Sequence, residues 1–353
     1  MSIEALRQKM HRARTWPPAP RHIAIAASAV AAIALVGIAT LSVKSAPHAL
    51  SARKAAMVAT VAPMATPLDA REAAAGPTGA PLLWRIKGPH ATIYLFGSVH
   101  VLRANMGWMD PRLYSAFDSA TEVWFEVPDP KVKPQVKPLT EKAFANQPVL
   151  LDGLTEPEKA ELAQVLRPYD FDYDRDRASH LKPEIAAAIV NSLAYTAMGY
   201  QFDRGADMSF LNLARTYNKP VRGFETVDAQ ISFLNEISRQ NHQDGTTALK
   251  HALATYAGQL SPDGTDITTM AACWRTGNEA CITRQVLAMR QNAPSEYEIL
   301  LRRRNANWVP RIEDMTKGSG TIFITVGAAH MVGPDGLVAQ LRAAGLTVER
   351  QDP

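Results

Sequence analysis

Short apolar runs alternate along this chain with longer stretches in which apolar residues recur at helical spacing. The runs Leu82–Ile86 and Thr92–Phe96 flank a turn sequence at residues 87–90, and two such runs around a turn predict a β-hairpin. Three more strands are predicted from their β-branched and aromatic content: Glu122–Glu126, Pro220–Glu225 and Thr321–Val326.

Between these strands the pattern has the 3.6-residue period of amphipathic helices. Thr155 and Glu158 have the spacing of a capping box, which predicts a helix running toward Leu166. Residues 244–316 are almost wholly helical in pattern, and residues 333–350 predict a helix that stops at Gly345 before a short edge strand. Other helices are predicted at Pro183–Met198, Ala206–Tyr217 and Asp228–Arg239. We therefore expect an α/β fold with a central, mostly β-sheet core and a large inserted helical lobe.

The N-terminal residues have a different pattern. Ile23–Val43 contains no charged residue and is long enough to cross a bilayer, and five basic residues precede it. By the positive-inside rule, residues 1–22 form a cytoplasmic basic arm, and the rest of a single-pass inner-membrane protein lies in the periplasm or another extracytoplasmic space. The alternative is a cleaved signal peptide and a secreted form, although the run is longer than a usual signal core. Residues 44–81 are rich in Ala and Pro and predict a flexible linker, which leaves one domain over residues 82–353.

The net charge of +4 and the pI near 9.0 could indicate a nucleic-acid partner. The basic residues are concentrated at one end, however: residues 1–54 hold eight of the 38 basic residues and one of the 34 acidic ones. The remainder of the chain is slightly acidic, so no nucleic-acid partner is expected.

Cys273 and Cys281 are the two cysteines of the chain. In an oxidising compartment such a close pair is permitted to form a disulfide. If the region were one continuous helix, two independent buried thiols would be expected instead, because positions eight apart lie too far from each other to bridge. Gly277-Asn278 indicates a turn between them, which favours the disulfide.

Two predicted strands are followed by the same short pattern. Gly97-Ser98-Val99-His100 follows the first, and Gly327-Ala328-Ala329-His330 follows the last. A glycine at a strand end lets the backbone turn sharply and leaves room for a ligand, and ligands bind at the carboxyl ends of strands in open α/β sheets. Two other strands end in Glu126 and Glu225, so four strands deliver a metal ligand or an acid–base group.

Two imidazoles with one or two carboxylates suit a divalent metal ion such as Mn²⁺, Co²⁺ or Zn²⁺ with a position left for water. The carboxylate that does not bind the metal would act as general base. The alternative is structural: each histidine caps a strand end and each glutamate pairs with a surface base. Four such side chains at strand ends favour a shared site.

Five segments together resemble the TraB/GumN family, to which the Tiki metalloproteases belong. They are the first G-x-x-H pattern, Gly205-Ala206-Asp207, Gly223–Gln230, Arg304-Asn305-x-x-Trp308 and Val326–Gly333, in this order between residues 83 and 350. The resemblance implies a membrane-associated protein with a metal-dependent, peptidase-like site.

The resemblance also assigns roles to residues. His100, His330, Glu126 and Glu225 would hold the metal ion, and one of the glutamates would be catalytic. Arg304 would stabilise an oxyanion or orient a substrate carboxylate, or else belong to a solvated basic face with its neighbours. Two further side chains would hydrogen-bond the metal ligands: Asn305 and Gln230.

We therefore expect a metal-dependent hydrolase that acts on a peptide or another extracytoplasmic substrate. The alternative is a non-catalytic regulatory module that binds a peptide or saccharide at the same site, and an esterase-like hydrolase is a third reading. Other enzyme classes are disfavoured, because the chain has no H-E-x-x-H, Walker A or G-x-S-x-G motif. The aspartates of Asp170–Asp176 resemble a calcium loop, but Arg175 replaces the required glycine, so we expect a solvated loop there.

Overall fold

The computed structural model describes residues 79–104, 106–127, 144–166, 179–197, 199–240, 245–256 and 267–353. The predicted basic arm and membrane segment lie outside these residues, as do nearly all of the predicted linker and the Asp170–Asp176 loop. Among the described helices, none combines the length and the apolarity needed to cross a bilayer.

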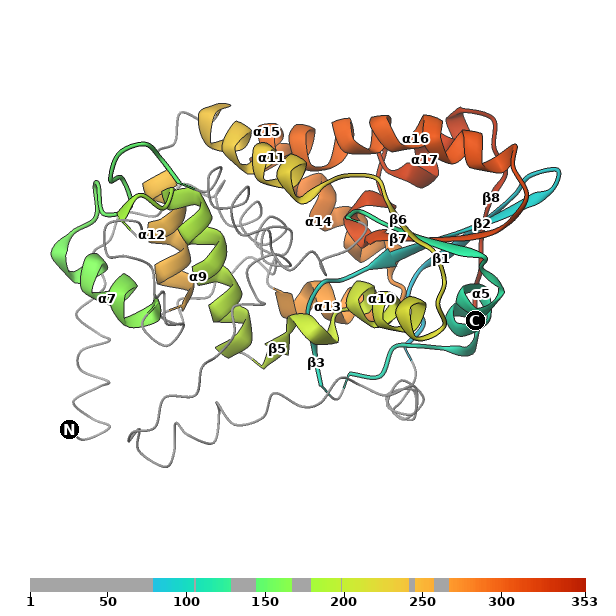
Figure 1. Ribbon diagram of the computed structural model, residues 1–353, viewed down its shortest axis with the longest axis horizontal. Helices are drawn as coiled ribbons and strands as arrows, with labels where there is room; N and C mark the ends of the chain where they lie inside the picture. Colours follow the sequence, from blue (N-terminus) through green and yellow to red (C-terminus); the bar gives the residue numbers. More distant parts are fainter. Residues whose placement is uncertain are drawn as a thin grey trace.

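The core of the molecule is a six-stranded mixed sheet with the strand order β6-β4-β7-β2-β1-β8 (Figure 1). The predicted hairpin is confirmed, since β1 and β2 pair antiparallel, while β2, β7, β4 and β6 run parallel to one another. The carboxyl ends of these four parallel strands therefore meet at one edge. The strands are β1 (Leu83–Lys87), β2 (Ala91–Ser98), β4 (Glu122–Phe125), β6 (Val221–Gly223), β7 (Gly320–Gly327) and β8 (Val348–Arg350).

Helices cover both faces of this sheet (Figure 1). On one face, Phe96 and Phe323 contact rings of the helices α5 (Pro111–Ser119), α10 (Ala206–Thr216) and α13 (Ile267–Arg275). The helices α16 (Arg303–Thr316) and α17 (Leu337–Ala343) lie on the other face. Strands buried on both faces explain why β2 and β7 are nearly continuous apolar runs in the sequence.

A second apolar core lies in a helical lobe beside the sheet, at the left of Figure 1. The lobe is made by α7 (Glu156–Leu166), α9 (Pro183–Ala197) and α12 (Gly245–Tyr256), and α11 (Val227–Gln240) contributes Ile231 and Leu234 to its core. The capping box that predicted α7 is confirmed, because the Thr155 backbone N–H and hydroxyl both donate to Glu158 Oε2, at 2.7 and 2.9 Å. A two-stranded sheet of β3 (Leu102–Arg103) and β5 (Tyr200–Gln201) links the two cores, because Leu102 belongs to the sheet core and Tyr200 to the core of the lobe.

Residues 244–316 are mostly helical where they are described, but their helices do not all belong to one lobe, as the expected inserted lobe implied. Apart from Ala271, the helices that follow α12 pack on the sheet core instead, through large side chains such as Trp274, Ile282 and Trp308. Apolar spacing reveals that a helix has a buried face and not which core receives it, and this explains the error. These helices are α13, α14 (Glu279–Asn292), α15 (Pro294–Tyr297), a π-helical turn (Glu298–Arg302) and α16.

The predicted disulfide is confirmed. Cys273 and Cys281 are bonded, with their Cα atoms 5.9 Å apart. The bridge is allowed because α13 and α14 are separate helices, and the turn between them contains Gly277 with φ +62°. The segment Cys273–Cys281, closed by this disulfide, is called the α13–α14 corner below.

Candidate functional site

The carboxyl edge of the parallel strands gathers the predicted site residues. Glu126 directly follows β4, and Glu225 follows β6 by two positions, where its backbone N–H donates to the carbonyl oxygen of Glu126 at 2.8 Å. His100 follows β2 by two positions, and His330 ends the 3₁₀ turn after β7. Parallel pairing thus places four residues from distant parts of the chain at one edge, as the strand pattern predicted.

Three of these side chains converge on Gly327. Its backbone N–H donates to Glu126 Oε1 at 2.8 Å. A Cβ atom placed on Gly327 would lie 3.3 Å from Glu126 Oε1, 3.6 Å from His330 Cδ2 and 3.9 Å from His100 Nε2. A side chain at Gly327 would therefore crowd all three groups, so the glycine of the second G-x-x-H pattern lets them approach one another closely.

Arg304 lies at the centre of the site and is only 1% exposed. Its Nε and Nη2 donate to the two carboxylate oxygens of Glu225, both at 2.8 Å, and Nη2 also donates to Glu126 Oε2 at 2.6 Å. Its Nη1 donates to the carbonyl oxygen of Leu300 at 3.0 Å and to His330 Nε2 at 3.2 Å. These contacts use all five N–H donors of the guanidinium.

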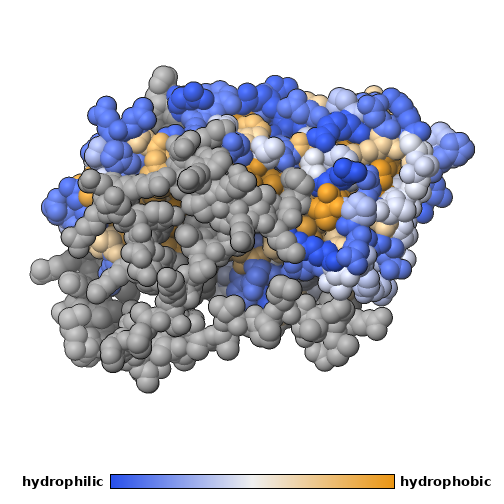
Figure 2. Space-filling model, viewed as in Figure 1, coloured by the Kyte–Doolittle hydropathy of each residue, from blue (hydrophilic) through white to orange (hydrophobic). Residues whose placement is uncertain are grey.

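This arrangement limits what Arg304 can do. Burial would lower the pKa of Arg304, but Glu126 and Glu225 outweigh it and raise the pKa above its ordinary value. Its donors are all taken within the protein, so Arg304 in this structure orients the neighbouring side chains and offers no donor to a substrate carboxylate. It does not belong to a solvated basic face, although Arg302 and Arg303 do lie on one, and the surface along α16 is hydrophilic (Figure 2).

The two glutamates differ in their electrostatic environment. Burial raises the pKa of Glu225, and the charge of Arg304 offsets this only in part. Burial acts in the same direction on Glu126, but Arg304, His330 and His100 together with the Gly327 N–H lower the pKa of Glu126 well below its usual range. Glu126 is therefore the more firmly ionised carboxylate. Gln230 Nε2 lies 3.3 Å from Glu126 and 3.4 Å from Glu225, where it donates to an oxygen of each.

His330 is buried and held in one orientation. Asn305 Oδ1 lies 2.7 Å from His330 Nδ1, and Asn305 Nδ2 donates to the carbonyl oxygens of His330 and Asp335. Burial and the charge of Arg304 lower the pKa of His330 to about 3, so the ring is neutral. Nδ1 then carries the proton and donates to Asn305, and Nε2 accepts from Arg304. Asn305 thus makes hydrogen bonds to the ring and the backbone of His330.

His100 is paired with a carboxylate that the sequence did not single out as a site residue. Its Nδ1 lies 2.9 Å from Asp207 Oδ2. Burial would lower the pKa of His100. The charge and hydrogen bond of Asp207, with a smaller contribution from the charge of Glu126, outweigh this and raise the pKa to about 9. Asp207 enters the site because α10 begins beside the first motif, where the Ala206 N–H donates to Val99 O at 2.8 Å. The glycine before it is required, since a Cβ on Gly205 would lie 2.3 Å from His100 O.

The donor chemistry of this site fits a divalent metal ion in part. His100 Nε2 and Glu126 Oε1 face the same space, and each has its orientation fixed by a neighbour. His330 Nε2 lies 3.8 Å from Glu126 Oε1, which is within the roughly 3–4 Å that separates two ligands of one metal ion.

Two contacts of Arg304 count against the full four-ligand set. Arg304 already donates to His330 Nε2, and it occupies both oxygens of Glu225. Within the described residues, no group of three or more His, Cys, Asp or Glu side chains has a ready metal-binding arrangement. In this structure the two donors that face the same point without a contact to Arg304 are thus His100 Nε2 and Glu126 Oε1, while His330 Nε2 is bound by Arg304.

Comparison with known proteins gives the chain a family. A family model described as TraB/PrgY/gumN matches residues 82–350. The chain is also similar to an uncharacterized protein of Treponema pallidum (strain Nichols), with 22% identity over 286 residues that cover 74% of this chain and 80% of that protein. No solved structure matches the chain. The resemblance noted from the sequence is thereby confirmed: the chain belongs to the TraB/PrgY/GumN family.

Proposed function

We propose that this protein is a metal-dependent hydrolase that cleaves peptide bonds or related carbonyl substrates. The observation that carries the proposal is the convergence of His100, Glu126 and His330 around Gly327, where each has an atom within 4 Å of the position of a Cβ on that glycine. Each histidine has its Nδ1 fixed by an oxygen, of Asp207 for His100 and of Asn305 for His330. Histidines that bind a metal ion through Nε2 are usually oriented in this way.

The bound ion would supply an activated water molecule and polarise the scissile carbonyl group. Glu126 stays ionised and presents Oε1 to the same space, where it accepts a single hydrogen bond, from Gly327. Glu126 therefore suits a place at the reacting centre. Glu225 has both oxygens bound by Arg304 and keeps that guanidinium in place, so we assign it a positioning role.

The location proposed for this activity is the outer side of the cytoplasmic membrane. The uncharged run Ile23–Val43 and the basic residues before it support a single-pass anchor in this orientation. A periplasmic reporter enzyme fused after residue 353 should be active in a Gram-negative host. A fusion that is active only as a cytoplasmic reporter contradicts the proposed orientation.

A second candidate is a module that binds a peptide or saccharide without cleaving it. The observation that favours it is the Arg304 network, which satisfies both glutamates and one ring nitrogen of His330 without any ligand. A self-contained network of this kind would keep the edge of the sheet rigid in a binding protein as well.

Peptide cleavage separates the two candidates. The full chain is purified from membranes in detergent and incubated with a peptide library and Mn²⁺, Co²⁺ or Zn²⁺. His100→Ala and His180→Ala are treated in parallel, because His180 is a half-buried histidine whose ring bonds a backbone carbonyl oxygen in the helical lobe. We expect cleavage by the wild type and by His180→Ala and its loss in His100→Ala. Bound peptide that stays intact in all three samples supports the binding module instead.

A further inference from the structure

Trp274 of α13 holds the start of the first G-x-x-H motif. The side chain is fully buried, and its Nε1–H donates to the carbonyl oxygen of Gly97 at 2.6 Å, across a separation of 177 residues. The last pair of the β1–β2 ladder is Leu83 with Phe96, so the Gly97 carbonyl group lies just past the end of that ladder. The indole thus bonds β2 on the side where its pairing with β1 ends, whereas on the other side the pairing of β2 with β7 continues to Ser98.

Ring packing keeps the indole in place. The ring of Trp274 packs edge-on against Phe96 with centroids 6.3 Å apart, and it lies 5.5 Å from the ring of Trp108. Phe96 is the residue directly before Gly97. The same tryptophan therefore contacts the motif strand through both its ring and its N–H group.

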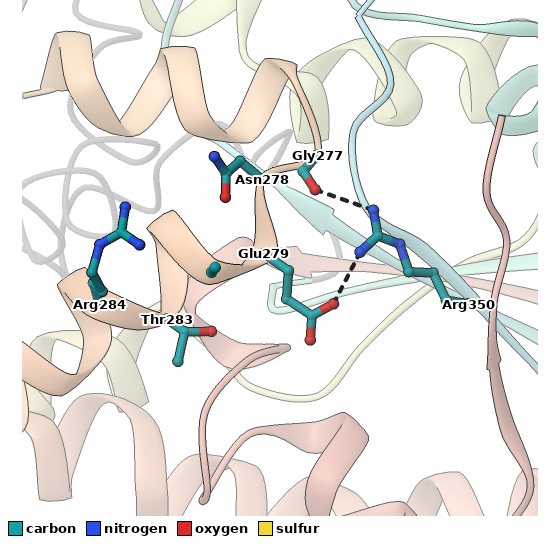
Figure 3. A pocket seen from close by; sticks show the side chains of 7 residues that line it. Gly277, Asn278, Glu279, Thr283, Arg284 and Arg350 are labelled. Carbon is teal, nitrogen blue, oxygen red and sulfur yellow. Dashed lines mark hydrogen bonds and ion pairs between the residues drawn. The ribbon is translucent and has the colours of Figure 1, made fainter.

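The α13–α14 corner, which carries Trp274, is tied down on several sides. The carbonyl oxygen of Arg275 accepts from the Ala80 N–H at 2.8 Å, and Arg275 Nε donates to Gly107 O at 2.8 Å. On its outer side the corner forms a surface pocket in which Arg350 of β8 donates to Glu279 and to the carbonyl oxygen of Gly277 (Figure 3). The Cys273–Cys281 disulfide closes the corner covalently.

The segment Gly97–His100 is consequently held from two directions. Trp274 binds the carbonyl group of Gly97, and the first residue of α10, Ala206, binds that of Val99. His100 comes next and must meet Asp207, which belongs to α10. The hydrogen bond from Ala206 fixes the end of the segment. The hydrogen bond from Trp274 fixes the position at which the segment begins to turn.

We propose that Trp274 is a positioning residue for His100 and that the Cys273–Cys281 disulfide maintains this position by fixing the corner that carries it. The functional meaning of this inference rests on the proposed function, because it matters for catalysis only if His100 belongs to a working site. The geometric inference can be tested without substrate or metal ion.

The test compares three variants of the full chain in detergent. Trp274→Phe keeps most of the ring and loses the N–H donor, and Cys273→Ser/Cys281→Ser opens the corner. Trp124→Phe is the control, because the Trp124 indole also donates a hydrogen bond, but to Glu122 on β4, at 2.9 Å. Amide hydrogen exchange is measured along the chain, and the imidazole signals of His100 and His330 are followed by NMR, with no metal ion added.

In Trp274→Phe we expect amide exchange at Ser98, Val99 and His100 to accelerate about fivefold to tenfold, as the loss of one buried hydrogen bond implies. The His100 imidazole signal should shift, and that of His330 should stay. The double cysteine variant should show the same local pattern. The proposal is overturned if these amides exchange at the same rate in Trp274→Phe as in Trp124→Phe. It is also overturned if the exchange rates rise equally over the whole domain.

This outcome is separable from that of the proposed function. If the wild type cleaves no peptide but Trp274→Phe shows the local change, the positioning role stands and the hydrolase proposal fails. If the wild type cleaves peptides while the His100 signal and its local exchange are unchanged in Trp274→Phe, the positioning role fails and the hydrolase proposal stands.

Discussion

Arg304 binds Glu225 through two parallel hydrogen bonds, from Nε to Oε1 and from Nη2 to Oε2, each 2.8 Å long. The two side chains are 1% and 8% exposed, so this ion pair is almost completely removed from water. The planar guanidinium matches the carboxylate in this geometry and leaves its remaining N–H groups in fixed directions. Those groups reach Glu126 and His330, so one cation orients three of the side chains at the edge of the sheet.

Replacement of Arg304 by Met should destabilise the protein strongly. Removal of one partner from a buried ion pair leaves the other charge uncompensated and costs about 3–5 kcal/mol. Arg303→Met is the matched control, because Arg303 is only half-buried and pairs with Glu236, and it should cost about 1 kcal/mol or less. The free energy of unfolding from denaturant titrations measures both values. If both variants lose a similarly small amount of unfolding free energy, the buried ion pairs of Arg304 do not stabilise the fold as their geometry implies.

The replacement Asn305→Asp should raise the pKa of His330. In the wild type, burial and Arg304 lower this pKa to about 3, and Asn305 is a neutral acceptor at Nδ1. A carboxylate in its place keeps the acceptor but adds a negative charge that favours the protonated ring. The ¹⁵N NMR shifts of the His330 ring, followed from pH 4 to pH 8, report this pKa. An unchanged neutral ring throughout the range would show that Asn305 does not set the protonation state of His330.

The His100–Asp207 pair predicts a specific dependence of stability on pH. The pKa of His100 in the folded protein is raised to about 9, above the ordinary value of 6.5. A raised pKa means that the stabilisation is fully present below pH 6.5 and is lost as the pH rises through about 9. We therefore expect Asp207→Asn to be less stable than the wild type at pH 6, with a difference that shrinks toward pH 10. A difference that grows with pH would contradict the pairing.

Much of the site was predictable from the sequence, because each strand is an apolar run that ends in a distinctive polar residue. The order of the strands was not required for this, since the carboxyl ends of parallel strands meet at one edge in any order. His100, Glu126, Glu225 and His330 all lie at that edge, as expected.

The central position of Arg304 was less apparent, although a signal for it exists. Leu300, Arg304, Trp308 and Ile312 are spaced four residues apart, and all four are buried. Arg304 therefore occupies a position in an apolar stripe, which separates it from its neighbours Arg302, which is exposed, and Arg303, which is half-buried. A charged residue at such a position has to find buried partners, and both glutamates supply them.

Other contacts had no local signal. Asp207 belongs to one of the segments that carry the family resemblance, but nothing in the sequence pairs it with His100, which lies 107 residues away, and Trp274 meets Gly97 across 177 residues. Each of these pairs depends on how separate helices dock on the sheet. Apolar periodicity does not specify that docking, just as it did not specify that residues 244–316 divide between two cores.

Binding of Co²⁺ by the full chain tests the central claim most directly, because the ion reports its own coordination through its visible absorption. We expect one ion per chain, held by nitrogen and oxygen ligands, with an affinity that rises about tenfold per pH unit between pH 6.5 and 9 because the proton of His100 must leave. His100→Ala should abolish the spectrum and His180→Ala should preserve it. If the wild type and His100→Ala give the same spectrum, or if neither binds Co²⁺ at any pH in this range, the proposed metal centre is wrong.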